Sequence, residues 1–395
     1  MNLKIICIHN YYKQPGGEDI VFQAEVELLK KFGHTVVEYI EDNKQLDEFH
    51  YLKNAVNAVW SRRTQEQLRL LLRSTKPDLV HFHNTFMRIS PAAYFVCKEI
   101  GIPVVQTLHN YRLLCPKATL MRDGNICEKC IGKAMPWPSL KYGCYRNSKS
   151  ATAVVTGMLS LHRWLKTWQE KITIYIALSE FSRQKYIVGG LPGDKIMVKP
   201  NFIYPDLGAG EHKCDKALFV GRISAEKGVS TLLEAWQQLK EIPLSIIGNG
   251  PLDAMLRQKA FINQLSDIEL LGWKPRNQVL QAMQEMRLLI FPSESYEAFS
   301  MIIVEAFGCG LPVIASRLGT MAEIIQDGHT GLLFTPGDPN DLAAKVKWAW
   351  ANPTRMTEMG KAARKEFEKK YTADKNYSIL MEIYQKAIEI NKFKK

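Results

Sequence analysis

Two carboxylates lie at the opening of an apolar, helix-like stretch. Glu297 and Glu305 are separated by seven residues in ESYEAFSMIIVEA, which directly follows the strand-like run RLLIFPS. We predict that a helix begins near Phe299–Ser300 and places Glu305 in its second turn. The amides of Phe299, Ser300 and Met301 would then have no acceptor within the helix, and together with the helix dipole they would form an anion site.

An anion held between two carboxylates requires nearby cations, because the carboxylates alone would repel it. The segment FVGRISAEKG supplies Arg222 at the end of a predicted strand and Lys227 just before a predicted helix. An arginine fork and a lysine point charge suit a diphosphate. Glu297 and Glu305 would accept hydrogen bonds from neutral hydroxyls on either side of it. The alternative for the two glutamates is a solvated helix end and one buried, paired side chain.

Strand-like and helix-like stretches alternate along all 395 residues. In the first half we predict strands at 3–9, 34–40, 78–84 and 102–109, and helices at 19–32, 64–75 and 91–100. In the second half we predict strands at 216–223, 243–250, 268–273, 287–293, 311–316 and 330–336, and helices at 229–240 and 339–350. This alternation is typical of parallel sheets covered on both faces, whose ligands bind beyond the carboxyl ends of the strands.

A domain boundary is predicted near residue 205, because prolines and glycines between residues 200 and 210 interrupt the periodicity. We therefore expect an α/β protein of two doubly wound, Rossmann-like domains, 1–205 and 206–375, that face a deep cleft. Each is long enough to bury its own core. The last helix, 376–395, is expected to pack back on the first domain.

These motifs resemble those of the retaining glycosyltransferases of family 4, which have the GT-B fold. EAFSMIIVEA fits the E-x7-E pattern and GRISAEKG fits the G-R-x4-K-G pattern. IIGNGP and LLGWKP fit two further signatures of the donor domain, in the expected order, and the similarity continues to about residue 345. The family usually has glycine after the first glutamate, where this chain has Ala298, and this departure concerns the shape of the local loop.

The resemblance implies a role for each motif residue. Arg222 and Lys227 would bind the donor diphosphate and stabilise the leaving nucleotide. Glu297 would hold hydroxyls of the donor sugar, Glu305 would bind the ribose, and the backbone near Gly272 would meet the base. The implied donor-binding residues are Gly16, Gly17, Arg222, Lys227, Asn249, Gly272, Glu297, Phe299, Ser300, Met301 and Glu305. The implied catalytic residues are His109, Arg222, Lys227 and Glu297.

Two features of the first half carry part of this resemblance. Gly16–Gly17 follow the first strand, and their lack of side chains permits close approach of a ligand to the backbone. An ordinary strand–helix turn is the alternative, above all for the neighbouring Glu18 and Asp19. His109 ends a strand and resembles the histidine that contacts the donor sugar near its reacting carbon. The other strand-end histidines, His9, His81 and His83, are expected to be structural.

The expected chemistry needs no cofactor. Cations and helix amides aimed at the departing phosphate would stabilise the charge that develops there. The chain has no Asp-x-Asp motif, which favours metal-independent catalysis. In the family, the leaving phosphate is thought to take the acceptor proton on the same face of the sugar, which gives retention. A UDP-sugar is favoured as donor, and a GDP-sugar remains open.

Four of the eight cysteines lie in an insertion at about 112–148. Cys115, Cys127, Cys130 and Cys144 have the spacing C-x11-C-x2-C-x13-C. A C-x2-C knuckle with two flanking cysteines suits tetrahedral zinc, and the glycine- and proline-rich loop around it lacks a core of its own. We predict a structural zinc site. Four reduced thiols and an iron–sulfur cluster are the alternatives.

The net charge of +12 is unevenly distributed. Residues 112–171 hold eleven Lys and Arg against three acidic residues, a net charge of +8. Such a patch indicates an anionic partner, which is a phospholipid surface, a diphosphate-linked lipid or nucleic acid, and the alternative is that it serves solubility alone. The stretch 151–171 is of helix length and places Trp164 and Trp168 four residues apart beside basic side chains. That pattern suits a membrane surface, and a buried interdomain helix is the alternative.

We expect a cytoplasmic enzyme in peripheral contact with the inner membrane face, because the chain has no apolar run of 18 residues and its first apolar run is too short for a signal sequence. The expected acceptor is a glycan or a lipid-diphosphate-linked sugar, and the expected product a surface polysaccharide. A sugar-nucleotide 2-epimerase is one alternative. Another is a zinc-bearing, basic nucleic-acid-binding protein, which would leave the donor motifs unexplained, so no nucleic-acid partner is expected.

Overall fold

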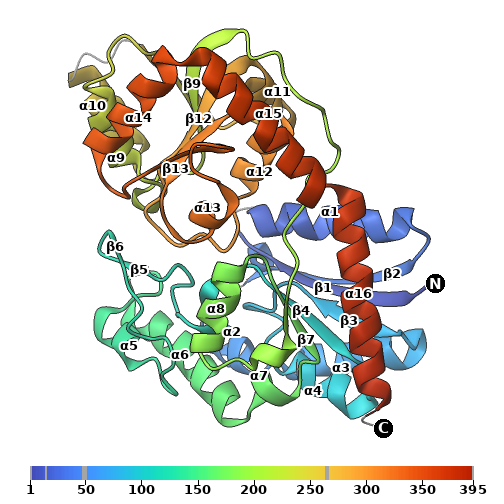
Figure 1. The fold of residues 1–395 in the computed structure, drawn as a ribbon. Coiled ribbons are helices and arrows are strands. Elements are labelled where there is room, and N and C mark those ends of the chain that lie inside the picture. Colours follow the sequence, from blue (N-terminus) through green and yellow to red (C-terminus); the bar gives the residue numbers. More distant parts are fainter. Residues whose placement is uncertain (1, 14–15, 47–50, 263–266, 394–395) are drawn as a thin grey trace. The chain divides into compact units, whose positions relative to one another are not determined.

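The computed structural model describes residues 2–13, 16–46, 51–262 and 267–393. The chain divides into two compact units, which are described separately (Figure 1). The first unit comprises Met1–Leu120, Cys127–Asn201 and Asn376–Lys395, and the second comprises Met121–Ile126 and Phe202–Lys375. The chain thus passes between the units at residues 201–202, four residues before the predicted boundary, and returns at residues 375–376.

The first unit is built on a six-stranded parallel sheet of order β2-β1-β3-β4-β7-β8 (Figure 1). Its strands are β1 (Lys4–Tyr11), β2 (Thr35–Asp42), β3 (Leu79–Phe82), β4 (Val104–Leu108), β7 (Ile174–Ala177) and β8 (Ile196–Val198). The central strands β1, β3 and β4 are almost wholly buried, as expected for parallel strands covered on both faces. The order reverses between β1 and β3, so ligands are expected beyond the carboxyl ends of these strands.

Helices cover this sheet. They are α1 (Gly17–Lys31), α2 (Tyr51–Val59), α3 (Arg62–Thr75), α4 (Ala93–Ile100), α5 (Trp137–Tyr142), α6 (Lys149–Trp164), α7 (Thr167–Glu170), α8 (Glu180–Val188) and α16 (Ala373–Lys392), with short 3-10 turns at Asn43–Gln45, Tyr111–Leu113 and Gly193–Lys195. Leu380, Ile383 and Tyr384 of α16 share a buried core with Leu3 and Ile5. The last helix therefore packs on the first unit.

The stretch 151–171 does not form one continuous helix. Helix α6 ends at Trp164, Lys166 takes a left-handed conformation (φ 50°), and α7 begins at Thr167. As a result Trp164 is 78% exposed whereas Trp168 is buried. The helix-length stretch is therefore interrupted, and the turn at Lys166 places Trp168 in the core while Trp164 stays exposed.

The second unit has its own six-stranded parallel sheet, of order β11-β10-β9-β12-β13-β14. Its strands are β9 (Cys214–Val220), β10 (Leu244–Ile247), β11 (Ile268–Gly272), β12 (Met286–Phe291), β13 (Val313–Ser316) and β14 (Gly331–Phe334). Its helices are α9 (Val229–Trp236), α10 (Asp253–Ile262), α11 (Arg276–Glu285), α12 (Met301–Gly308), α13 (Gly319–Ile324), α14 (Pro339–Ala351) and α15 (Pro353–Lys370), with a 3-10 turn at Ala225–Lys227. A short antiparallel pair, β5 (Met121–Arg122) and β6 (Asn125–Ile126), belongs to the same unit.

Alternate residues of these strands enter two different cores. Leu289 and Phe291 of β12 pack in one core, and Leu288 and Ile290 pack in the other. The strand is therefore apolar without interruption, because both faces of the sheet are covered by helices. The α/β class and the two doubly wound sheets agree with the sequence prediction. Within the described residues, we find no helix that is both long and apolar enough to cross a membrane.

Candidate functional site

In the second unit, two loops that follow β9 and β12 bring Lys227 and Glu297 together. Gly228 has a left-handed conformation (φ 69°), and a Cβ there would lie 1.9 Å from the carbonyl oxygen of Pro292. Only glycine permits this approach of the two backbones. The Lys227 Nζ consequently donates a hydrogen bond of 2.6 Å to Oε1 of Glu297.

Further hydrogen bonds hold the carboxylate and the main chain of Glu297 in place. The hydroxyl of Ser293 donates a bond of 2.8 Å to the same oxygen, Oε1. The hydroxyl of Thr320 donates a bond of 2.9 Å to the main-chain oxygen of Glu297. Lys227 and Glu297 keep 24% and 17% of their side-chain surface exposed. The pair is thus held in place but remains accessible to a ligand.

Helix α12 begins where the sequence predicts. Ser300 is its N-cap, and the Ser300 hydroxyl accepts a bond of 3.4 Å from the amide of Ile303. The first-turn amides near Met301 have no acceptor inside the helix, as in any α-helix. Glu305 follows in the second turn and is buried, with 5% of its surface exposed.

Glu305 is paired with Arg276, which sequence reasoning missed. The Nε of Arg276 donates a bond of 2.9 Å to Oε1 of Glu305, and a terminal nitrogen of Arg276 donates one of 3.0 Å to the carbonyl of Tyr204. Burial raises the pKa of Glu305, and the charge of Arg276 offsets part of that rise. The motif LLGWKP ends one residue before Arg276, so a basic residue at this strand–helix junction was the available signal.

The other implied donor-binding residues of the second unit lie at the same edge of this sheet, whereas Gly16 and Gly17 belong to the first unit. Arg222 is exposed just beyond β9, and Asn249 is exposed just beyond β10. The carbonyl of Asn249 accepts a bond of 2.9 Å from the amide of Ile223, which joins the two loops. Gly272, at the end of β11, has φ 68° and open space where a Cβ would lie. The second unit therefore gathers cations, carboxylates and open backbone at the carboxyl ends of β9 to β12.

In the first unit, His109 follows β4 and contacts a second histidine. The Nε2 of His109 lies 3.0 Å from Nδ1 of His83, and the two rings stack with centroids 5.2 Å apart. The Nε2 of His83 lies 3.3 Å from Oε1 of Glu25. His83 had been expected to be structural only, but it connects His109 to a buried carboxylate. The His-x-His spacing on a strand, with both side chains on one face, was the available signal.

Burial decides the protonation state of His83 and His109. Burial, followed by the nearby His81, lowers the pKa of His83 to about 3, and burial with His83 beside it lowers the pKa of His109 well below its usual range. Both imidazoles are therefore neutral near pH 7. The Glu25 carboxylate favours the proton of His83 on Nε2, so His83 Nδ1 accepts a hydrogen bond from His109 Nε2. His109 then presents an unprotonated Nδ1, which can accept a hydrogen bond from a hydroxyl.

Glu25 is itself held by buried partners. Burial alone would raise its pKa, but Lys199 and His81 hold that pKa well below the usual range. The Nζ of Lys199 donates bonds of 2.8 Å to Oε2 of Glu25 and of 3.1 Å to the Asn376 side chain on α16. His81 also bonds Tyr384 of α16 at 2.7 Å. The last helix thus completes the network beneath His109.

Within the described residues, Glu25, His81 and His83 form the one group of potential metal ligands whose donor atoms all lie within 4.8 Å of one another. We do not assign a metal to this group. The ammonium of Lys199 is 2.8 Å from Glu25 and 1% exposed, so it supplies the positive charge that a cation would bring.

The Gly16–Gly17 turn caps α1. The amide of Gly16 donates a bond of 2.8 Å to Oδ2 of Asp19, whose Oδ1 lies 2.7 Å from Nε2 of His9. Asp19 is therefore structural, in line with the alternative stated for it. A Cβ on Gly16 would meet open space, and its φ of −129° requires no glycine, so the missing side chain leaves room beside the turn.

Glu18 differs from Asp19. The side-chain amide of Asn110, the neighbour of His109, donates a bond of 3.1 Å to Oε2 of Glu18. Burial raises the pKa of Glu18 from 4.5 to about 7, against the lowering effect of Asn110. Glu18 therefore exchanges a proton near neutral pH, a property that its position in an ordinary turn did not indicate.

None of the eight cysteines, all of which lie in the described residues, forms a disulfide. Cys115 and Cys130 are buried, whereas Cys127 and Cys144 are partly exposed. Burial first, and then the nearby Cys115, Cys144 and Cys127, raises the pKa of Cys130 to about 11. The four thiols of the insertion therefore lie near one another, although among the described residues no three of their sulfurs all lie within 4.8 Å of one another. The zinc site stays a prediction.

Two family models match this chain. Residues 16–207 match the family model described as Glycosyltransferase Family 4, and residues 210–366 match the model described as Glycosyl transferases group 1. An uncharacterized glycosyltransferase of Methanocaldococcus jannaschii is 36% identical over 168 residues, which cover 42% of this chain and 47% of that protein. The amylovoran biosynthesis glycosyltransferase AmsK of Erwinia amylovora is 27% identical over 228 residues, 54% of this chain and 56% of that protein. The matched region spans less than half of the length of each of the first curated relatives.

The fold is also that of a solved structure. HepE of Anabaena, in complex with UDP, superimposes with a TM-score of 0.70 over 96% of this chain and 99% of that chain, at 16% identity. At this identity the similarity establishes the architecture, which is GT-B. The two family matches, one mainly in each unit, support a glycosyltransferase of family 4.

Proposed function

We propose that this chain is a retaining glycosyltransferase of the hexosyltransferase type that takes its sugar from a nucleotide-diphosphate sugar. A UDP-sugar is favoured over a GDP-sugar, in keeping with the UDP complex of HepE. The observation that carries the proposal is the edge of the second sheet, where Lys227 meets Glu297 at 2.6 Å and Arg276 meets Glu305 at 2.9 Å. A partly exposed carboxylate, Glu297, and a buried one, Glu305, each with its own cation, can bind hydroxyls of one ligand without repelling its phosphates.

Catalysis at this edge would rest on charge. Breaking the bond between sugar and diphosphate develops negative charge on the leaving phosphate and positive character at the sugar. Arg222, Lys227 and the first amides of α12 would stabilise the phosphate, and Glu297 would hold the sugar hydroxyls. Because these groups already provide positive charge, we propose that turnover needs no metal. His109, with its unprotonated Nδ1, is proposed to accept a hydrogen bond from the donor sugar.

The acceptor is proposed to be a glycan or a lipid-linked sugar in surface polysaccharide biosynthesis, as the name of the Erwinia relative suggests. We also propose a cytoplasmic enzyme in peripheral contact with an anionic membrane. Trp137 and Trp164 are 55% and 78% exposed. Lys133 lies 5.9 Å from the ring of Trp137. Exposed indoles beside lysines suit the interface of a bilayer.

Zinc is proposed as a structural ion of the four-cysteine insertion. Cys115, Cys127, Cys130 and Cys144 form no disulfide, lie near one another and would serve as its ligands. Elemental analysis of the purified protein should give about one zinc per chain. Exchange of Cys127 and Cys130 for serine should release it and lower the melting temperature. Absence of zinc together with unchanged melting would contradict the proposal.

The donor site can be tested by titration calorimetry with UDP and GDP in the presence of a chelator. Selective binding of one nucleotide, lost in Lys227→Ala, is the expected result. Binding of neither nucleotide would contradict the proposed donor site. Conversion of a nucleotide sugar without any acceptor would indicate the alternative activity, a 2-epimerase. Salt-dependent binding of RNA or DNA without nucleotide binding would indicate the non-enzymatic alternative.

A further inference from the structure

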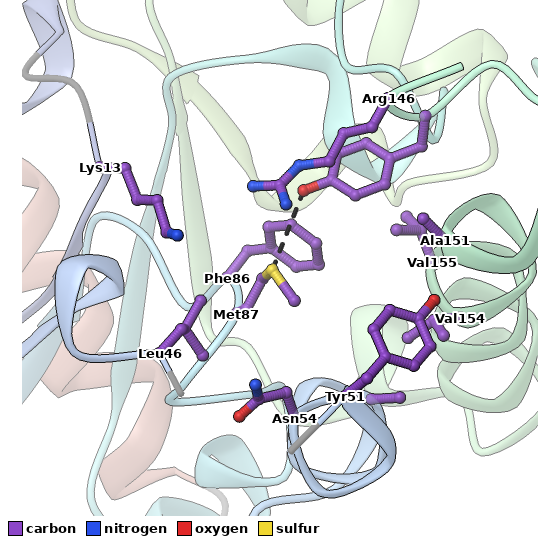
Figure 2. A pocket seen from close by; sticks show the side chains of 12 residues that line it. Lys13, Leu46, Tyr51, Asn54, Phe86, Met87, Arg146, Ala151, Val154 and Val155 are labelled. Carbon is purple, nitrogen blue, oxygen red and sulfur yellow. Dashed lines mark hydrogen bonds between the residues drawn. The ribbon is translucent and has the colours of Figure 1, made fainter. Parts of the chain in front are cut away.

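A cavity of about 210 Å³ lies in the first unit, separate from the contacts described above (Figure 2). It opens beyond the carboxyl ends of β1, β2 and β3, because Lys13, Leu46 and Phe86 follow these strands. The opposite wall comes from α2 and α6. A site at this edge of an open parallel sheet is where ligands of such folds bind.

The cavity combines two cations with apolar walls. Figure 2 shows the charged ends of Lys13 and Arg146 directed inward from two sides, and Phe86 and Met87 near the middle of the view. Among the twelve described residues that line it, these two are basic and none is acidic. Most of the others are aliphatic or aromatic, such as Val154 and Val155 of α6. The lining therefore suits a ligand with an anionic group attached to an apolar chain.

Hydrogen bonds and a stacked arginine hold the cavity wall formed by Phe86 and Met87 in place. The amide of Phe86 donates a bond of 3.0 Å to the side chain of Asn84, and the side chain of Asn43 donates one of 3.2 Å to the carbonyl of Phe86. The guanidinium of Arg112 stacks 4.5 Å from the centroid of the Phe86 ring and 5.2 Å from that of Tyr145. Buried amides and a third cation thus brace the wall from behind, which preorganises it for a ligand.

Apolar surface continues out of the cavity along α2. Tyr51 and Ala55 line the cavity, and Leu52 and Val56, next to them on the helix, are 79% and 65% exposed. Residues four apart form a stripe on a helix, so the two pairs make adjacent apolar stripes. The cavity volume of about 210 Å³ is below the ~300–1,000 Å³ usual for a whole small ligand, which suggests that it holds one end of a longer one.

The geometry points to this cavity as the binding site for the lipid–diphosphate part of an isoprenoid-diphosphate-linked saccharide, the acceptor of the transfer. This inference rests on the proposed glycosyltransferase function and names its acceptor class. Lys13 and Arg146 bind the diphosphate, and Met87 and the valines of α6 contact the first isoprene units. The apolar stripe of Leu52 and Val56 receives the chain beyond the cavity.

Titration calorimetry with farnesyl diphosphate, a short isoprenoid diphosphate, tests the assignment. The wild type should bind farnesyl diphosphate at least about tenfold more tightly than pyrophosphate or farnesol, because each lacks one half of the interaction. Arg146→Ala and Lys13→Ala should each weaken binding about tenfold, the usual effect of losing one charged contact. Val154→Asp should weaken it by a similar factor. Lys98→Ala, an exposed lysine on α4 outside the cavity, is the matched control and should not change it.

Measuring UDP binding to the same variants tests the proposed donor site separately from the proposed cavity site. The ion pairs of the proposed donor site lie in the second unit, whereas the cavity lies in the first. A protein that binds UDP but not farnesyl diphosphate would overturn the cavity assignment and leave the proposed function intact. Equal affinity for pyrophosphate and farnesyl diphosphate, or no effect of both Arg146→Ala and Val154→Asp, would also overturn it. If the wild-type protein binds farnesyl diphosphate but does not bind UDP, the result would count against the proposed function alone.

Discussion

The two units place charge at their sheet edges in opposite ways. In the second unit, the Lys227–Glu297 pair keeps 24% and 17% of its side-chain surface exposed. In the first unit, Lys199 and Glu25 are each 1% exposed. The side chains of a partly exposed ion pair can replace their contact with each other by contacts with a ligand at little cost in free energy. The side chains of a buried ion pair cannot. We infer that the second unit uses charge to bind, and that the first unit uses charge to hold a neutral histidine in one orientation.

The largest difference between the two pairs should appear in stability. Lys199→Met leaves the Glu25 carboxylate buried without its cation, and we expect a loss of about 3–5 kcal/mol in the free energy of unfolding. Chemical denaturation measures this loss. The double variant Lys199→Met with Glu25→Gln should recover part of it, because the uncompensated charge is gone. A loss below about 1 kcal/mol in the single variant would contradict the buried-pair interpretation.

The exposed pair should show the reverse behaviour. Lys227→Ala should lower turnover by about 10²–10³, the usual effect of removing one group that stabilises transition-state charge. Its free energy of unfolding should change by less than about 1 kcal/mol. Lys216→Ala, which removes an exposed lysine paired with Glu269 in the same unit, is the control and should leave turnover unchanged. Near-normal turnover of Lys227→Ala would refute its phosphate role.

Arg276 tests the intermediate case, since its partner Glu305 is buried but the arginine is 28% exposed. Arg276→Ala should raise the pKa of Glu305 further, which would favour its protonated form at lower pH and weaken the hydrogen bonds proposed between Glu305 and the ribose hydroxyls. We expect UDP affinity to fall about tenfold, and Arg276→Lys to restore part of it. Calorimetry at pH 6 and pH 8 should show the larger loss at pH 6. An equal loss at both values would indicate a purely structural role.

The smallest expected effect concerns Glu18. Its pKa is raised in the folded state to about 7, so its contribution to stability is fully present below about pH 4.5 and is lost as the pH rises through about 7. Glu18→Gln should therefore remove one component of the fall in unfolding free energy between these values. Glu27→Gln, at an exposed position of α1, is the control. Parallel stability curves for the wild type and Glu18→Gln would contradict the raised pKa.

Strand periodicity predicted both sheets because each strand contributes alternate residues to two cores, which makes it apolar throughout. The start of α12 was also predictable, since the N-cap serine precedes the apolar run. The break at Lys166 was not. No proline or glycine marks it, and the buried Trp168 lies beside His162, with the two ring centroids 5.7 Å apart.

Residue types and order alone determined the α/β class, the division into two parts and the carboxylates and cations of the second unit, because these depend on local patterns and on a strand-end rule. Only the tertiary structure decided which charges pair. Arg276 meets Glu305 across 29 residues, and Lys199 meets Glu25 across 174. The cavity between Lys13 and Arg146 depends in the same way on segments distant in the chain. Such contacts arise from the packing of whole elements, and no local spacing encodes them.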